Sequence, residues 1–285
     1  MQEALLVSSD PVFWLHCAEG RLLWNDYQRI LTASIDDFQP AWLVPLDGNG
    51  FHVAGDTLYM EDFDVLFSIP IAGGPITEID TGEYIGSAIG ANETSLYWMN
   101  TGHLQRMPLG GGPIEVLFDP PSPPNTGIDV LEVSSTALYL GLIEYGKGGD
   151  NHLLRAPLSD PSALSPFGPS FGDEFPFILL HGDSVLAVFE EPSGRRIARL
   201  GASGADPVTL VSASAEAKIH GVEGDLLLWS DQDRLYELDL AKAGATPVER
   251  VHHPGGINDA CLMGDTLYFG GEDNTIRRVI RTETP

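Results

Sequence analysis

Residues 91–117 read ANETSLYWMNTGHLQRMPLGGGPIEVL, and this stretch holds one full unit of the pattern that decides the fold. A turn of small polar residues leads into a short apolar segment that contains Tyr97 and Trp98. A second apolar segment ends at Pro108, and the turn GGGP leads into a third. Glycine-rich turns between short apolar runs predict β-hairpins rather than helices.

The same unit recurs along the whole chain. Seven copies of the turn-and-strand pattern end at Trp24, Met60, Trp98, Leu140, Val188, Trp229 and Phe269, with spacings of 36, 38, 42, 48, 41 and 40 residues. A unit of about 40 residues with four short strands is typical of a β-propeller blade. The sequence therefore predicts an all-β, seven-bladed propeller formed by residues 1–285. A six-bladed ring is the alternative if the weak copy in blade four or blade five is an insertion.

The two ends of the chain also fit a ring. The residues after Phe269 and those up to Trp24 together make one more repeat length, which a linear array has no reason to show. We expect residues 3–8 to form the fourth antiparallel strand of the last blade, because closure removes exposed sheet edges. The expected blades span approximately 11–46, 50–80, 86–118, 127–167, 176–211, 217–251 and 257–285.

The strand with Tyr97 and Trp98, followed by Pro108 to Gly112, resembles the repeat of bacterial propellers of the YWTD, NHL and TolB-like group. Residues 68–74, SIPIAGG, repeat this unit more loosely. The resemblance covers nearly the whole chain and implies the propeller fold. It does not decide function, because the group spans receptors, scaffolds and enzymes.

The charge of the chain excludes some partners. It has 41 Asp and Glu against 15 Lys and Arg, a formal net charge of −26. Nucleic acids and anionic membranes attract basic surfaces, so we expect neither as a partner. No apolar run is long enough to span a membrane, which predicts a soluble protein, and we expect a monomer. The compartment stays open, with secretion or export to the periplasm after signal removal as one possibility.

Two cysteines, Cys17 and Cys261, lie in apolar segments. We favour two buried free thiols that act as small apolar side chains. The alternative is one disulfide between the first and last repeats, which requires an oxidising compartment and a suitable geometry.

The first strand of each blade of a propeller lines the central axis. One aligned position, eleven residues before the end of each copy, holds Asn49, Ser87, Asp129, Lys218 and Asn258, with Phe13 and Phe177 in blades one and five. His220 and Asp259 lie close to this position in the sequence. These residues predict a polar channel mouth that binds a cation or a small polar ligand. A water-filled channel without a ligand is the alternative.

A second aligned position suggests a metal site. His16, His52 and Glu132 each lie eight residues before the end of their copy. Histidine and carboxylate side chains are common metal ligands, and oxygen-rich loops favour calcium. With Asp129 and Asp259, these residues are the candidate ligands for Ca²⁺ or another divalent cation. Channel histidines that bond to the backbone are the alternative.

The motif content favours binding over catalysis. There is no P-loop and no H-E-x-x-H pattern. We expect a binding propeller that recognises a protein or a small polar ligand through its mouth-side loops. The first alternative is a metal-dependent hydrolase or lyase that uses Asp129, Asn258, Asp259 and His220. The second is a carbohydrate-binding propeller that uses aromatic side chains such as Trp42 or Tyr145.

Overall fold

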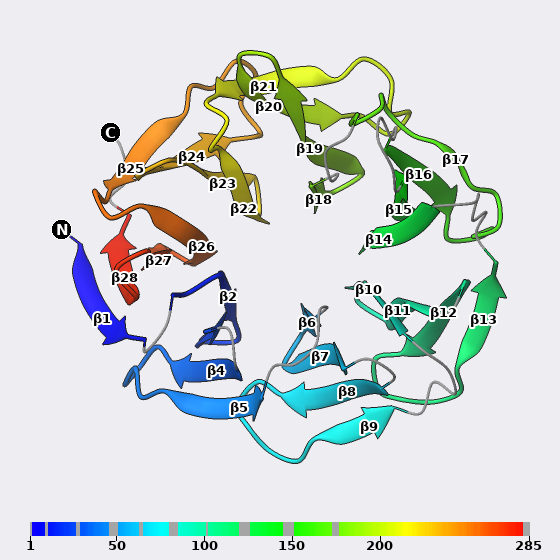
Figure 1. Ribbon diagram of the computed structural model, residues 1–285, viewed down its shortest axis with the longest axis horizontal. Helices are drawn as coiled ribbons and strands as arrows, with labels where there is room; N and C mark the ends of the chain where they lie inside the picture. Colours follow the sequence, from blue (N-terminus) through cyan, green and yellow to red (C-terminus); the bar gives the residue numbers. More distant parts are fainter. Residues whose placement is uncertain are drawn as a thin grey trace.

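The structure is a computed structural model that describes residues 2–8, 11–26, 29–45, 51–62, 65–79, 85–100, 102–119, 126–144, 151–172 and 177–281. For residues 62, 85–87, 126 and 129 the backbone alone is described. Seven antiparallel sheets of four strands surround a central axis (Figure 1). The seven-bladed propeller is confirmed, and the six-bladed alternative is wrong. Across these described residues, no helix is long and apolar enough to span a membrane.

Blades one to three run outward from the axis in chain order. Their strands are β2 (Trp14–Ala18), β3 (Arg21–Asn25), β4 (Arg29–Ser34) and β5 (Ala41–Pro45); β6 (Phe51–Ala54), β7 (Thr57–Asp62), β8 (Val65–Pro70) and β9 (Thr77–Ile79); and β10 (Ile85–Ala91), β11 (Ser95–Asn100), β12 (His103–Pro108) and β13 (Glu115–Phe118).

Blades four to six repeat this order, and blade seven supplies only three strands from the C-terminal part of the chain. Their strands are β14 (Thr126–Val133), β15 (Ala137–Glu144), β16 (His152–Pro157) and β17 (Ser165–Pro166); β18 (Ile178–His181), β19 (Ser184–Glu191), β20 (Gly194–Leu200) and β21 (Val208–Ala213); β22 (Lys218–Glu223), β23 (Leu226–Asp231), β24 (Arg234–Asp239) and β25 (Val248–His252); and β26 (Ile257–Met263), β27 (Thr266–Gly271) and β28 (Thr275–Ile280).

The N-terminal strand closes the ring. β1 (Glu3–Val7) pairs antiparallel with β28 and becomes the fourth strand of blade seven (Figure 1). Leu6 of β1 is buried in a core cluster that also holds Leu15 of blade one and Tyr268 of blade seven. The prediction that an N-terminal strand completes the last blade is therefore confirmed, and this strand covers Glu3–Val7.

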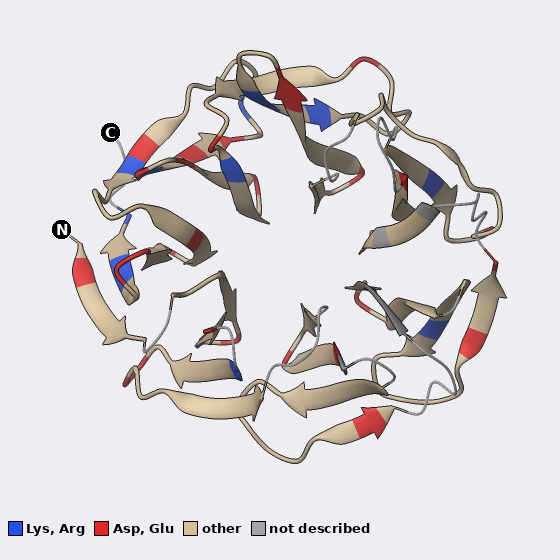
Figure 2. Cartoon of the chain, viewed as in Figure 1, with Lys and Arg blue, Asp and Glu red and all other residues tan. Residues whose placement is uncertain are grey.

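Local turn chemistry produces the hairpins, and packing between neighbouring blades produces the core. Gly55 and Gly264 each begin the two-residue turn between the first and second strands of a blade, with φ of 60° and 58°. Glycine adopts positive φ without the steric cost that a Cβ brings. The repeat aromatics Trp98 and Phe269 are fully buried, and Trp98 packs in one cluster with Tyr59 of the preceding blade. Acidic residues are distributed around the ring rather than gathered in one blade (Figure 2).

Candidate functional site

The inner strands surround a central cavity of about 890 Å³. They are the first strands of their blades, and because every blade repeats the same strand order, they all begin at the same end of the channel (Figure 1). We call this end the entry mouth. It is defined by six cavity-lining residues at or next to the starts of these strands: Phe13, Trp14, Phe51, Phe177, Lys218 and Asn258.

Aromatic side chains form much of the entry mouth. Phe13 and Phe177 are 42% and 49% exposed, although both side chains are large and apolar. The rings of Trp14 and Phe51 meet edge to face with centroids 4.1 Å apart, and the Trp14 ring stacks on His16 with centroids 5.5 Å apart. Apolar and aromatic walls with a few polar groups are typical of small-molecule sites.

Some of the predicted polar mouth residues line the cavity, and the side chains of the others are not described. Four of them line the cavity, namely Lys218, His220, Asn258 and Asp259. Asn49 lies outside the described residues, and Ser87 and Asp129 lie on β10 and β14 without described side chains. In the ring order of the blades, the polar mouth residues of blades six and seven lie between the aromatic residues of blade five and those of blades one and two.

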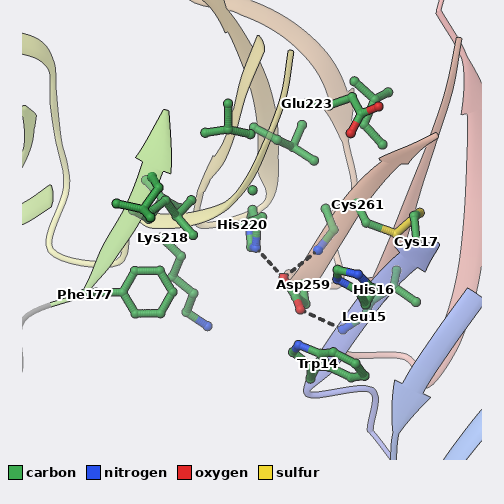
Figure 3. A pocket seen from close by; sticks show the side chains of 18 of the residues that line it. Trp14, Leu15, His16, Cys17, Phe177, Lys218, His220, Glu223, Asp259 and Cys261 are labelled. Carbon is green, nitrogen blue, oxygen red and sulfur yellow. Dashed lines mark hydrogen bonds and ion pairs between the residues drawn. A yellow bond between two sulfur atoms is a disulfide. The ribbon is translucent and has the colours of Figure 1, made fainter. Parts of the chain in front are cut away.

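Asp259 connects three blades through its carboxylate (Figure 3). Its Oδ1 lies 2.7 Å from Nδ1 of His220 in blade six, and its Oδ2 accepts the backbone N–H of Leu15 in blade one at 2.7 Å. The backbone N–H of Ala260 also donates to Oδ1, at 2.8 Å. Because all three partners donate to the carboxylate, they hold it in one orientation.

His220 extends this network to Ser230. Its Nε2 lies 2.8 Å from Oγ of Ser230, so Asp259, His220 and Ser230 are connected in the order of a nucleophilic triad. A carboxylate only accepts hydrogen bonds, so Nδ1 of His220 is the donor to Asp259. Ser230 is only 1% exposed and is not part of the cavity wall. In this arrangement the three residues link blades six, seven and one and do not present a nucleophile to the channel.

Three titratable side chains lie deeper in the channel, on the inner strands of blades one, two and four. Burial, together with the charge of neighbouring His16, lowers the pKa of His52 to about 4. Burial also lowers the pKa of His16, against the opposing effect of Asp259. Burial raises the pKa of Glu132 to about 7. Just below neutral pH these three groups are therefore mainly uncharged.

The predicted metal ligands do not form a compact group in the described structure. His16, His52, Glu132 and Asp259 line the cavity, whereas the side chain of Asp129 is not described. Within the parts of the chain that the structure describes, no three His, Cys, Asp or Glu side chains lie close enough together to hold a metal ion. The site for Ca²⁺ or another divalent cation stays a prediction.

The two cysteines form a disulfide. Cys17 of β2 and Cys261 of β26 are bonded, with their Cα atoms 5.7 Å apart. The favoured interpretation as two free thiols is wrong, and the alternative of a bond between the first and last repeats is confirmed. Ring closure places β2 beside β26, which brings together residues that are 244 positions apart in the chain.

One further pattern lies away from the channel wall. Residues 168–172, GPSFG, have the G-x-S-x-G spacing of a nucleophile elbow. An elbow requires a sharp turn from a strand into a helix. Here Gly172 instead forms an isolated bridge with Asn151, and its N–H donates to Oγ of Ser170 at 2.9 Å. This segment is therefore not an elbow.

Sequence reasoning missed two parts of the cavity wall. Trp14 and Phe51 lie within two residues of the aligned mouth position. An alignment of that single position does not include them, although their aromatic side chains could have indicated a ligand site. The cavity is also lined by Glu190 and Arg195, which form an ion pair across the β19–β20 hairpin. The sequence signal for this pair is the segment EEPSGRR at residues 190–196, with two acidic residues before the turn and two arginines after it.

Comparisons with known proteins identify the fold. No family model matches the chain, and no curated protein matches it. A catalytically inactive variant of virginiamycin B lyase from Staphylococcus aureus, solved with quinupristin, is 14% identical, with 99% of each chain covered and a TM-score of 0.69. The WD40 domain of Pan2 from Neurospora crassa is 11% identical, with 99% of this chain and 98% of that chain covered and a TM-score of 0.67.

A chain of the nidogen/laminin complex is 15% identical, with 82% of this chain and 93% of that chain covered and a TM-score of 0.53. Identities this low show the fold alone. The class of protein that the structure defines is the seven-bladed β-propeller, and its structural neighbours include a bacterial lyase and a domain found in a protein complex.

Proposed function

We propose that this propeller binds a small molecule in its central channel and that the ligand enters between the aromatic side chains of the entry mouth. One observation carries the proposal. Phe13 and Phe177 come from different blades, line the same cavity and remain close to half exposed. Full burial of such a side chain contributes about 1.5–3 kcal/mol, so a ligand with an apolar ring gains free energy by covering these residues.

The shape and the bracing of the wall support a preformed site. The cavity volume of about 890 Å³ falls within the range of roughly 300–1,000 Å³ that is typical of ligand pockets. The Asp259 network and the disulfide hold the inner strands of blades six, seven and one together. A braced wall loses little conformational entropy when a ligand binds. The structural similarity to a lyase solved with quinupristin adds support for small-molecule binding by a propeller of this shape.

The proposal is tested with N-phenyl-1-naphthylamine, a neutral fluorophore with an apolar ring system. We expect saturable binding to the folded protein, measured as an increase in probe fluorescence. The substitution Phe177→Ala removes ring contacts at the entry mouth and should weaken binding about tenfold, which corresponds to about 1.4 kcal/mol.

Trp42→Ala is the matched control. Trp42 is also an exposed aromatic residue, 69% exposed, but it lies on the outer strand β5. We expect this variant to bind the probe like the wild type. Absence of saturable binding, or equal losses in both variants, would show that the channel is not the site.

The other functional hypotheses stay predictions. A protein partner at the mouth-side loops is consistent with the similarity to a chain of the nidogen/laminin complex. The metal-dependent hydrolase or lyase has no described set of metal ligands. For the carbohydrate-binding alternative, Tyr145 lies outside the described residues, and the Arg29 guanidinium lies 4.7 Å from the centroid of the Trp42 ring.

A further inference from the structure

Lys218 is a charged side chain in the mouth of the channel. It is the first residue of β22, its side chain is exposed, and it lines the cavity. Figure 3 shows this side chain extending into the channel beside the ring of Phe177. Among the described residues, Lys218 forms no ion pair, whereas Lys242 lies 2.8 Å from Asp239. The remaining lysine, Lys147, lies outside the described residues.

Asp259 and Arg195, two of the charged groups described in the cavity wall, have partners within the protein. The carboxylate of Asp259 accepts hydrogen bonds from His220, Leu15 and Ala260. Arg195 is paired with Glu190 and also donates to the backbone carbonyl of Ala217 at 2.9 Å. Among the described residues of the entry mouth, the ammonium group of Lys218 is therefore a charge that has no ion-pair partner in the protein and can contact a ligand.

The deeper wall does not offset this charge. His16, His52 and Glu132 are mainly uncharged just below neutral pH because they are buried. Glu223 lies at the opposite end of β22, so the length of the strand separates it from Lys218. The net charge of −26 is spread over the molecule, and salt screens charges beyond about 8 Å at physiological ionic strength. Carboxylates beyond that distance therefore weigh little against a direct contact with Lys218.

We infer that the ligand of the central channel is an aromatic anion, a compound with an apolar ring and a carboxylate or sulfonate group. The ring lies against Phe177, and the anionic group pairs with the ammonium of the neighbouring Lys218. This inference rests on the proposed small-molecule function and narrows the ligand class. Ligands that combine a large apolar surface with one well-placed charged contact suit a pocket of this composition.

Two probes with the same ring system test the anion inference independently of the proposed small-molecule binding. 8-Anilinonaphthalene-1-sulfonate carries a sulfonate, and N-phenyl-1-naphthylamine is its neutral counterpart. We expect Lys218→Gln to weaken binding of the sulfonate about tenfold and to leave binding of the neutral probe unchanged. Lys218→Arg keeps the charge and should retain most of the affinity for the sulfonate.

Lys242→Gln is the control, because it removes a lysine charge from the turn after β24, outside the cavity wall. It should change neither affinity. If Lys218→Gln weakens both probes equally, or neither, the anion inference is wrong while the proposed function stands. If neither probe binds to the wild type, both are wrong. Cooperative thermal unfolding of every variant shows that the probes report on the folded protein.

Discussion

Individual side chains in the channel have opposite responses to pH because burial disfavours whichever form is charged. His52 is neutral when it loses a proton, and burial lowers its pKa to about 4. Glu132 is neutral when it gains a proton, and burial raises its pKa to about 7. The ordinary values for these groups in an unfolded chain are about 6.5 and about 4.3, so both groups couple folding to proton binding.

The signs of these two effects differ. Between pH 4 and 6.5 the unfolded chain protonates His52 more readily than the folded protein does, so this residue makes stability fall as pH falls. Between about pH 4.3 and 7 the folded protein retains the proton of Glu132, so this residue makes stability fall as pH rises. Each shift corresponds to at most about 4 kcal/mol.

We therefore predict that Glu132→Gln flattens the loss of stability between pH 5 and 7.5, and that His52→Gln flattens the loss below pH 6.5. Urea unfolding across this pH range measures both effects. Glu216→Gln, an exposed change on the loop before β22, serves as the control and should reproduce the wild-type profile. A Glu132→Gln profile parallel to that of the wild type would contradict the assignment of a buried neutral acid.

At the scale of secondary-structure elements, three different interactions hold the ring closed where the N-terminal and C-terminal parts of the chain meet. β1 pairs with β28, the disulfide joins β2 to β26, and Asp259 of β26 accepts the N–H of Leu15 of β2. This is the place where the two ends of the chain meet. A ring without closure would expose the edge of β28 and the core cluster that contains Leu6.

The double substitution Cys17→Ala and Cys261→Ala removes the covalent link between β2 and β26. We expect the free energy of unfolding to fall by about 2–5 kcal/mol, because the bond restricts the unfolded chain over a long loop. Chemical denaturation with and without a thiol reductant measures the loss. The reductant should destabilise the wild type to the level of the variant and leave the variant unchanged; identical midpoints for oxidised and reduced wild type would argue against the link.

For the whole molecule, charge is the dominant property besides the fold. The net charge is −26, and acidic residues are distributed around the ring (Figure 2). Such a charge favours solubility and opposes the compact state through self-repulsion. Paired side chains such as Arg234 and Glu249, 2.5 Å apart, offset only a small part of it.

Salt should therefore stabilise the protein. We predict that raising sodium chloride from about 0.02 M to about 0.3 M increases Tm at pH 8 by several degrees, because screening shortens the reach of the repulsion. Near the sequence pI of about 4.3 the same change in salt should have little effect, which serves as the control. A decrease of Tm with salt at pH 8 would mean that ion pairs outweigh the self-repulsion.

The blade pattern could be predicted because its causes are local. The turn at Gly55 has a positive φ, and the strand that follows it is buried at successive residues, from Leu58 to Met60. Both features repeat every 36 to 48 residues, so the number of blades and the closing strand follow from counting. The resemblance of the unit around Trp98 to bacterial propellers agrees with this fold.

The candidate site depends on contacts between blades that the repeat spacing does not predict. The inner strands β22 and β26 contain irregularities in register between Ile219 and Gly221 and between Ile257 and Asp259. Each irregularity shifts the alternation of side chains, so a fixed offset from the end of a copy does not say which residue faces the channel. His220 lies within one irregularity and Asp259 borders the other, so the contact between them depends on this local geometry.

The sequence by itself determined the all-β class, the seven blades, the closing strand and the strong acidity, because turn chemistry, hydrophobic pattern and composition act over short distances or over the whole chain at once. Only the tertiary structure decided the disulfide between Cys17 and Cys261, the link through Asp259 and the aromatic wall around Lys218. These features arise where ring closure and neighbouring blades bring together residues that are far apart in the chain. The local sequence around each residue does not show which distant residue it will contact.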